Sequence, residues 1–223
     1  MKKMFLIAAL YMAQFVSAQV SKEVGEFSAV KVFDRIDVML IKSSENRIDI
    51  KGSRANDVEV VTKNDELKIR MKFPKLLQGE DVSVTLYYNG AIDKVEASEG
   101  ARVASNDTFS GTSFELNAKE GAEIKLNLDV KNLDSKAHTG GILNITGKAD
   151  NHDISITSGG IFNGRELVTA QTEVSISAGG EAGVNATEYV EARTNAGGDI
   201  NIYGNPARVD QKSFAGGSID IIK

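Results

Sequence analysis

A pair of small residues recurs through the C-terminal half of the chain at nearly constant spacing. Each pair is Gly-Gly or Gly-Ala, and the first glycines are Gly100, Gly121, Gly140, Gly159, Gly179, Gly197 and Gly216. The intervals between them are 18 to 21 residues. Self-similarity at a period near 20 is typical of a solenoid, in which each repeat buries its apolar face against its neighbours. The sequence therefore predicts a rod of stacked repeats.

Apolar and polar residues alternate on both sides of each pair. The position three residues after the first glycine is almost always apolar: Val103, Ile124, Leu143, Phe162, Ala182, Ile200 and Ile219. A period of two indicates β-strands, and no helical or leucine-rich pattern accompanies it. We predict an all-β parallel β-solenoid of about seven coils, each built as strand, glycine turn, strand and a second turn at residues such as Gly147, Gly164 and Gly204.

The paired glycines have a backbone role in this interpretation. Either a corner requires a positive φ angle, or stacked backbones approach too closely for a Cβ atom. We therefore interpret the following residues as structural turn positions: Gly100, Gly121, Gly140, Gly141, Gly159, Gly160, Gly179, Gly180, Gly197, Gly198, Gly216 and Gly217.

The N-terminus has the pattern of a secretory signal peptide. Lys2 and Lys3 precede an apolar run, and Val16 and Ala18 fit the small-residue positions of a cleavage site. We predict a signal peptide over residues 1–18, cleaved after Ala18, and no membrane anchor once it is removed. The chain has no cysteine and hence no disulfides. The predicted location is the periplasm, the cell surface or the extracellular space.

The mature chain divides by its repeat pattern. Residues 19–95 lack the glycine spacing but alternate like strands, so we expect them to start or cap the solenoid; residues 96–223 carry the repeats. Without Lys2 and Lys3, 24 basic residues face 31 acidic ones, a net charge of −7. That balance, with no basic patch, argues against a nucleic-acid partner.

Several segments resemble a known family. FSAVKVFDRIDVMLIKSSENRIDIKG, NDELKIRMK, IDKVEASEGARV and NAGGDINIYGNPARVDQKSFAGGSIDI are similar to the putative auto-transporter adhesin, head GIN domain family. The similarity runs from about residue 27 to the end of the chain. It implies a right-handed parallel β-helix in an exported bacterial protein with an adhesion-like role. The chain departs from a true autotransporter, because it has no coiled-coil stalk and no strands of a membrane barrel.

A carbohydrate-active enzyme is the main alternative, because β-helices also carry polysaccharide hydrolases and lyases. Glu181 and Asp199 lie two residues after the first glycine in adjacent coils, which would place them about 5 Å apart. Retaining glycosidases use two carboxylates at such a separation. The simpler interpretation, which we favour, is a pair of solvated surface acids, since no long insertion builds a cleft around them.

The next column along the strands carries amides: Asn144, Asn163, Asn201 and Asp220. We expect a structural amide ladder, and a polar strip that binds a glycan is the alternative. The only histidines are His138 and His152, and we expect His152 to be packed in a column with Leu133 and Val190. No metal site and no cofactor are predicted.

We expect an exported, non-catalytic binding or adhesion-like module whose partner is a glycan or an envelope protein. A second alternative is an assembly subunit of the envelope. The last strand contains Ile219, Ile221 and Ile222, with no polar cap after it. An uncapped solenoid end exposes backbone donors and an apolar core, so homo-oligomer contacts or docking of another protein could occur at this end.

Overall fold

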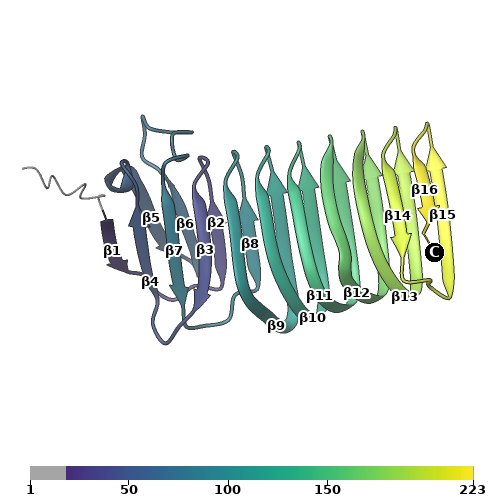
Figure 1. The fold of residues 1–223 in the computed structure, drawn as a ribbon, viewed down its shortest axis with the longest axis horizontal. Coiled ribbons are helices and arrows are strands. Elements are labelled where there is room, and N and C mark those ends of the chain that lie inside the picture. Colours follow the sequence, from purple (N-terminus) through teal and green to yellow (C-terminus); the bar gives the residue numbers. More distant parts are fainter. Residues whose placement is uncertain (1–18, 223) are drawn as a thin grey trace, which may run out of the picture.

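The computed structural model describes residues 19–222 and shows a straight rod built almost entirely of strands (Figure 1). The predicted signal peptide lies outside the described residues, as does Lys223. The rod is a parallel β-solenoid of about seven turns, which confirms the predicted fold class. Its only helical element among the described residues is the 3₁₀ turn η1 (Ala55–Asp57).

Five long strands form the middle of the rod, and each pairs in parallel with the next. Ile124 faces Leu143, which faces Phe162, so the predicted apolar columns stack in register. Three shorter strands continue the solenoid at its C-terminal end. The strands are β9 (Arg102–Lys119), β10 (Glu123–His138), β11 (Ile142–Thr157), β12 (Gly160–Ser177), β13 (Gly180–Asn195), β14 (Asp199–Tyr203), β15 (Arg208–Phe214) and β16 (Ser218–Ile221).

The two glycines of a pair do different work at the corner. Gly159 has a φ of +76° with open space beside it, and the first glycine of each pair has a similarly positive φ. At Gly160, by contrast, a Cβ atom would lie 2.2 Å from the carbonyl oxygen of Ala137 in the preceding coil. Corners of adjacent coils are hydrogen-bonded, as from the Gly159 amide to the Gly179 carbonyl. The glycines therefore stack in one corner column, as predicted.

The predicted second turn is wrong for most coils. β9 to β13 run through that position as single strands of 16 to 18 residues that bend rather than turn. Gly147 lies in the bend with a φ of +108°, where a Cβ atom would lie 2.0 Å from the Leu128 carbonyl oxygen. Close approach of backbones explains this glycine, and only Gly204 lies at a break between strands, β14 and β15.

The N-terminal strands form two further coils whose order along the rod is not their order in the sequence. Parallel pairing places the β2–β3 coil between the β6–β7 coil and the β8–β9 coil. The β2–β3 coil, which comes first in the sequence, thus lies between two coils that come later in the sequence. The strands are β2 (Ala29–Val32), β3 (Asp37–Lys42), β6 (Glu66–Met71), β7 (Ser83–Tyr88) and β8 (Lys94–Ala97).

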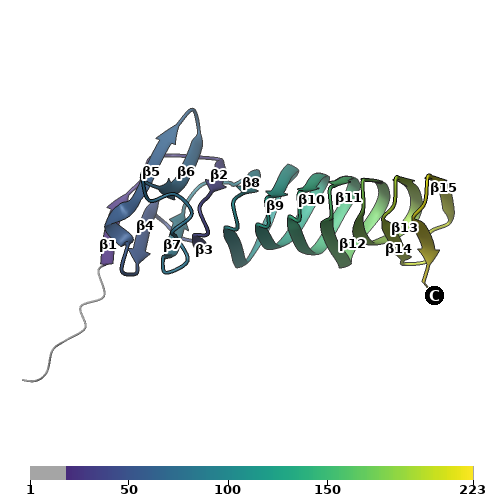
Figure 2. The same ribbon diagram turned by 90° about the horizontal axis from the view of Figure 1, so that it is seen from above.

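Antiparallel strands cover the first coil. β5 (Val58–Lys63) pairs with β6, while β4 (Arg47–Lys51) pairs with β7 and with β1 (Gln19–Glu23). Figure 2 shows these strands gathered at the N-terminal end of the rod. Ile48 and Ile50 of β4 are fully buried, so these strands close the apolar core as well as the hydrogen-bonding edge. The N-terminal region therefore both starts and caps the solenoid.

The opposite end of the rod has no such cover among the described residues. β15 pairs with β13 and β16 with β14, each on one side only. Phe214, Ile221 and Ile222 are exposed there, and Val209 and Ile219 are partly buried. Contact of this end with another protein or a second copy stays a prediction.

Candidate binding groove

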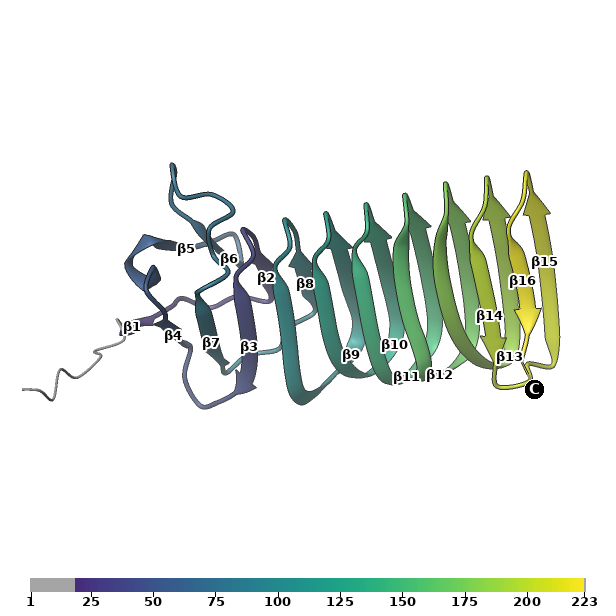
Figure 3. The same cartoon turned by 45° about the horizontal axis from the view of Figure 1, so that its top comes forward.

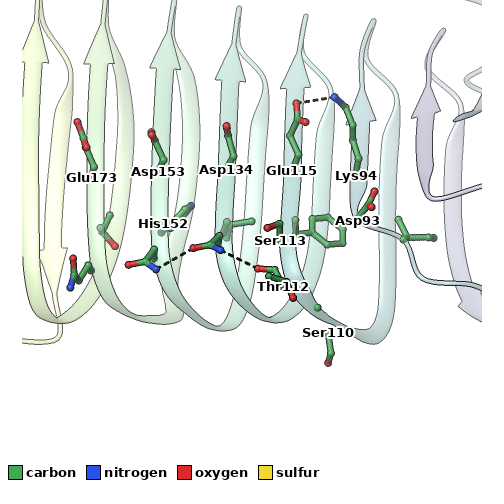
Figure 4. A pocket seen from close by; sticks show the side chains of 18 of the residues that line it. Asp93, Lys94, Ser110, Thr112, Ser113, Glu115, Asp134, His152, Asp153 and Glu173 are labelled. Carbon is green, nitrogen blue, oxygen red and sulfur yellow. Dashed lines mark hydrogen bonds and ion pairs between the residues drawn. The ribbon is translucent and has the colours of Figure 1, made fainter. Parts of the chain in front are cut away.

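One side of the rod carries a long groove of about 1000 Å³ that runs across β9 to β13 (Figure 4). It follows the bend of the long strands, so each coil contributes the same positions of its repeat. The segment Ala91–Lys94, before and at the start of β8, lines one end, and Tyr189 of β13 lines the other. Because the coils are stacked in register, the walls of the groove are columns of equivalent residues.

The first wall is a column of carboxylates, one on each of β9 to β12: Glu115, Asp134, Asp153 and Glu173. Glu191 and Asp210 continue the same column beyond the groove. Figure 4 shows the first four projecting side by side from successive strands. Neighbouring strands are about 4.8 Å apart, so the column repeats at that interval. A ligand lying along the groove would meet an acceptor group on each of these strands.

The second wall, two residues earlier on each strand, is a column of amides and hydroxyls. Its members in register are Ser113, Asn132, Asn151, Gln171 and Tyr189. The Asn151 side chain donates a hydrogen bond to the Asn132 oxygen (3.1 Å), and the Asn132 amide donates to the Thr112 carbonyl (3.4 Å). These bonds hold the amides in one orientation and leave further donors and acceptors for a ligand.

The floor between the walls is buried. Phe114, Leu133, His152 and Thr172 form this column, each less than 5% exposed. The packed position expected for His152 is confirmed: its ring lies edge-on to Phe162, and its Nε2 atom is 2.9 Å from the Ser135 hydroxyl. Burial lowers the pKa of His152 to about 3, so the imidazole is neutral at physiological pH.

Most of the carboxylates have a cationic neighbour on the same surface. Lys94 lies 2.9 Å from Glu115, Lys136 lies 3.1 Å from Asp134, and Arg193 contacts both Glu173 and Glu191. Asp153 has no ion-pair partner within the described part of the chain. These ion pairs are at least partly exposed to solvent and therefore weak, so contacts with a ligand can replace them. The acids can therefore accept hydrogen bonds from an incoming ligand.

The residues proposed for catalysis lie elsewhere. Glu181 and Asp199 are in register on adjacent strands, and both are exposed. Asp199 accepts a hydrogen bond from the Ser218 hydroxyl (2.8 Å). Neither residue lines the groove. The two acids are therefore neighbours on adjacent strands, as the repeat predicts, but they lie outside the groove.

We predict that Glu181→Gln combined with Asp199→Asn leaves the protein intact. Exposed acids away from buried networks contribute little, so the free energy of unfolding should change by about 0.5 kcal/mol or less. Chemical denaturation and assays on a polysaccharide panel would measure this. Polysaccharide cleavage by the wild type that disappears in the double variant would establish the enzyme alternative instead.

The asparagine column on the other part of the strands is only partly a ladder. Asn163 donates to the Asn144 oxygen (2.8 Å), and Asn144 donates to Glu123 (2.7 Å). Gly183 interrupts the column before Asn201, which is in register with Asp220. The four residues of the predicted strip do not line the groove: Asn144, Asn163, Asn201 and Asp220. Ligand binding at this strip stays a prediction.

Comparison with known proteins agrees with the fold. Residues 26–206 match the family described as "Putative auto-transporter adhesin, head GIN domain". The chain belongs to this family. The similarity stated from the sequence segments is therefore confirmed. No curated protein matches the chain.

Several solved structures share the architecture. A putative adhesin from Bacteroides fragilis superposes with a TM-score of 0.85 at 16% identity, covering 92% of this chain and 96% of that one. A putative adhesin from Parabacteroides distasonis gives 0.72 at 21%, covering 93% and 98%. A putative lipid binding protein from the same species gives 0.70 at 14%, covering 92% and 96%. At these identities the likeness concerns the fold alone.

Two kinds of feature are absent from residues 19–222. No cluster of three or more histidine or acidic side chains has the geometry to hold a metal ion. No helix there is long and apolar enough to cross a membrane.

Proposed function

We propose that this GIN-domain protein is exported by its N-terminal signal peptide, cleaved after Ala18, and acts at the cell envelope as a non-catalytic, adhesion-like binding module. The membership of the adhesin family supports a role at the surface. In this proposal the ligand is an extended polysaccharide that lies lengthwise in the groove.

The observation that carries the proposal is the match between the groove and the repeat. Each of the four strands β9 to β12 offers a carboxylate from one wall and an amide or hydroxyl from the other, with a buried floor between them. Carboxylates and amides are good partners for sugar hydroxyls because they accept two hydrogen bonds or accept and donate at once. A regular polymer of sugars presents such hydroxyls repeatedly. A groove that extends over five successive strands suits a chain better than a compact small molecule.

The test compares two hydrogen-bonded amide pairs on different surfaces. Asn132→Ala with Asn151→Ala removes the pair in the groove, and Asn144→Ala with Asn163→Ala removes the pair outside it. We expect glycan-array binding by the mature protein to fall at least tenfold in the groove variant, since two lost ligand contacts cost about 1.4 kcal/mol or more. The control variant should bind like the wild type.

Weaker binding in the control variant alone would place the binding site on the asparagine column that contains Asn144 and Asn163. Unaltered binding in both variants, with unchanged thermal unfolding, would contradict a polysaccharide site on either surface. Cleavage of the bound polymer would instead favour the hydrolase or lyase alternative. Concentration-dependent assembly without glycan binding would favour a docking role for the end formed by β15 and β16.

A further inference from the structure

The corner between β6 and β7 differs from every other corner of the rod. Residues 72–82, which we call the β6–β7 loop, join the two strands at this corner. The neighbouring coils turn within four residues at the same corner, at 33–36 and 98–101. Figures 1 and 3 show the loop rising beyond the ends of the adjacent strands. It is an expanded corner that projects away from the body of the solenoid.

The tip of this loop is apolar and open to solvent. Phe73 is 85% exposed, the highest value among the exposed large hydrophobic residues, and Leu76 and Leu77 are 45% and 46% exposed. Single exposed apolar residues are ordinary on protein surfaces. Three within five residues on a projecting tip form a patch of the kind that marks an interaction site.

The base of the loop is held by a buried carboxylate of the adjacent coil. Asp34, 1% exposed, accepts hydrogen bonds from the amides of Met71 (2.9 Å) and Leu77 (2.8 Å). Its carbonyl oxygen accepts a third bond from the Gly79 amide (3.0 Å). The backbone on both sides of the tip is therefore fixed. These backbone hydrogen bonds hold the apolar side chains of the tip in their exposed position.

Further contacts support the two sides of the loop. The Lys72 ammonium donates to the Asn56 carbonyl (2.7 Å), and the Arg54 guanidinium donates to the Gln78 side chain. Neither contact covers Phe73, Leu76 or Leu77. The tip is thus braced at its base and bare at its end.

Charge indicates what kind of surface would receive the tip. Residues 72–78 contain two lysines and no acid, in a chain of net charge −5. The nearest acids in sequence, Glu80 and Asp81, follow at the base, where the Asp81 backbone lies against Gly52. Lysines beside exposed Phe and Leu are the composition that binds anionic lipid headgroups while apolar side chains enter the acyl region.

We propose that the β6–β7 loop docks this protein onto a lipid bilayer that contains anionic phospholipid. Phe73, Leu76 and Leu77 enter the membrane interface, while Lys75 contacts a phosphate group. The proposal does not depend on the groove or its ligand.

The binding test uses residues 19–223 and two kinds of vesicle, phosphatidylcholine alone and phosphatidylcholine mixed with phosphatidylglycerol. We expect sedimentation with the mixed vesicles, and at least a tenfold loss of partitioning in Phe73→Ser with Leu77→Ser, because both changes remove apolar surface that the membrane would bury. Phe214→Ser removes the exposed phenylalanine at the other end of the rod and should bind like the wild type. Lys75→Glu should weaken binding, whereas Lys131→Glu on β10 should not.

A spectroscopic readout is available because the chain contains no tryptophan. In Phe73→Trp the new fluorophore should shift to shorter wavelength when mixed vesicles are added, and in Phe214→Trp it should not. Equal shifts in the two variants, equal partitioning to the neutral vesicles, or no binding of the wild type to either vesicle would overturn the proposal.

Discussion

Gly160→Ala is expected to destabilise the solenoid far more than a substitution one residue earlier. The new Cβ atom would lie 2.2 Å from the Ala137 carbonyl oxygen and 2.6 Å from its carbonyl carbon. Both atoms belong to the backbone of the preceding coil, where Ala137 is held in the parallel ladder by Ala118 on one side and Ile156 on the other. Neither chain can move away without breaking that ladder. Overpacking at a rigid site should cost about 3 kcal/mol or more.

The matched control is Gly159→Asn. Gly159 has a φ of +76° and nothing within 4 Å of a built Cβ atom, so only backbone conformation is at stake. Asparagine tolerates the left-handed region, and the expected cost is about 1 kcal/mol. Chemical denaturation of both variants measures the difference. A greater loss in Gly159→Asn than in Gly160→Ala would show that conformation, and not close packing, limits these corners.

The repeat and the apolar columns could be predicted from the sequence because they are local and periodic. A constant spacing of glycine pairs indicates stacked corners, and alternation on each side identifies the inward residues. The bend at Gly147 could not be distinguished from a turn, since a positive φ serves both. Only the close approach to Leu128 reveals that the strand continues.

The order of the N-terminal coils was beyond sequence reasoning. β2 and β3 lack the glycine pair and pair with strands distant in the chain, for example Val30 with Leu67 and with Val95. Alternation identifies each segment as a strand but contains no information about its neighbour. The exposure of Phe73 was equally hidden, because an apolar residue near a strand end reads as core.

The groove had a signal in the sequence that the position-by-position reading missed. Counting six residues back from the first glycines gives Lys94 and then six successive acids. Eight residues back gives amides and hydroxyls in the central coils, including Asn132 and Asn151. Glu181 and Asn144 lie in columns closer to the glycines, where the repeat is easier to align. That the columns six and eight residues back flank a hollow follows from the bend, which the sequence did not reveal.

His152 is expected to make the solenoid sensitive to acid. Burial lowers the pKa of its imidazole to about 3, against 6.5 in an unfolded chain. Between these values the unfolded state binds the proton and the folded state does not. Stability contributed by the neutral ring is therefore present above pH 6.5 and is lost as the pH falls toward 3. At 1.36 kcal/mol for each pH unit, acidification from pH 7 to pH 4 should remove about 3 kcal/mol.

The test is His152→Leu combined with Ser135→Ala. Leu133 occupies the same column one coil earlier, so leucine has a precedent there, and the second change avoids leaving the buried Ser135 hydroxyl without its partner. Protonation of Asp49 and Glu96 also destabilises the folded protein in acid, because the pKa of each carboxyl is lowered in the fold. Contacts with Ser21 and Arg47 lower the pKa of Asp49, and burial opposes them. Contacts with Lys119 and Lys31 lower the pKa of Glu96, and burial again opposes them. The informative quantity is therefore the difference between the double variant and the wild type in urea denaturation from pH 7 to pH 4. The wild type should lose about 3 kcal/mol more than the variant over this range. Parallel curves would mean that the ring already carries its proton in the folded protein, which would require water to reach the floor of the groove.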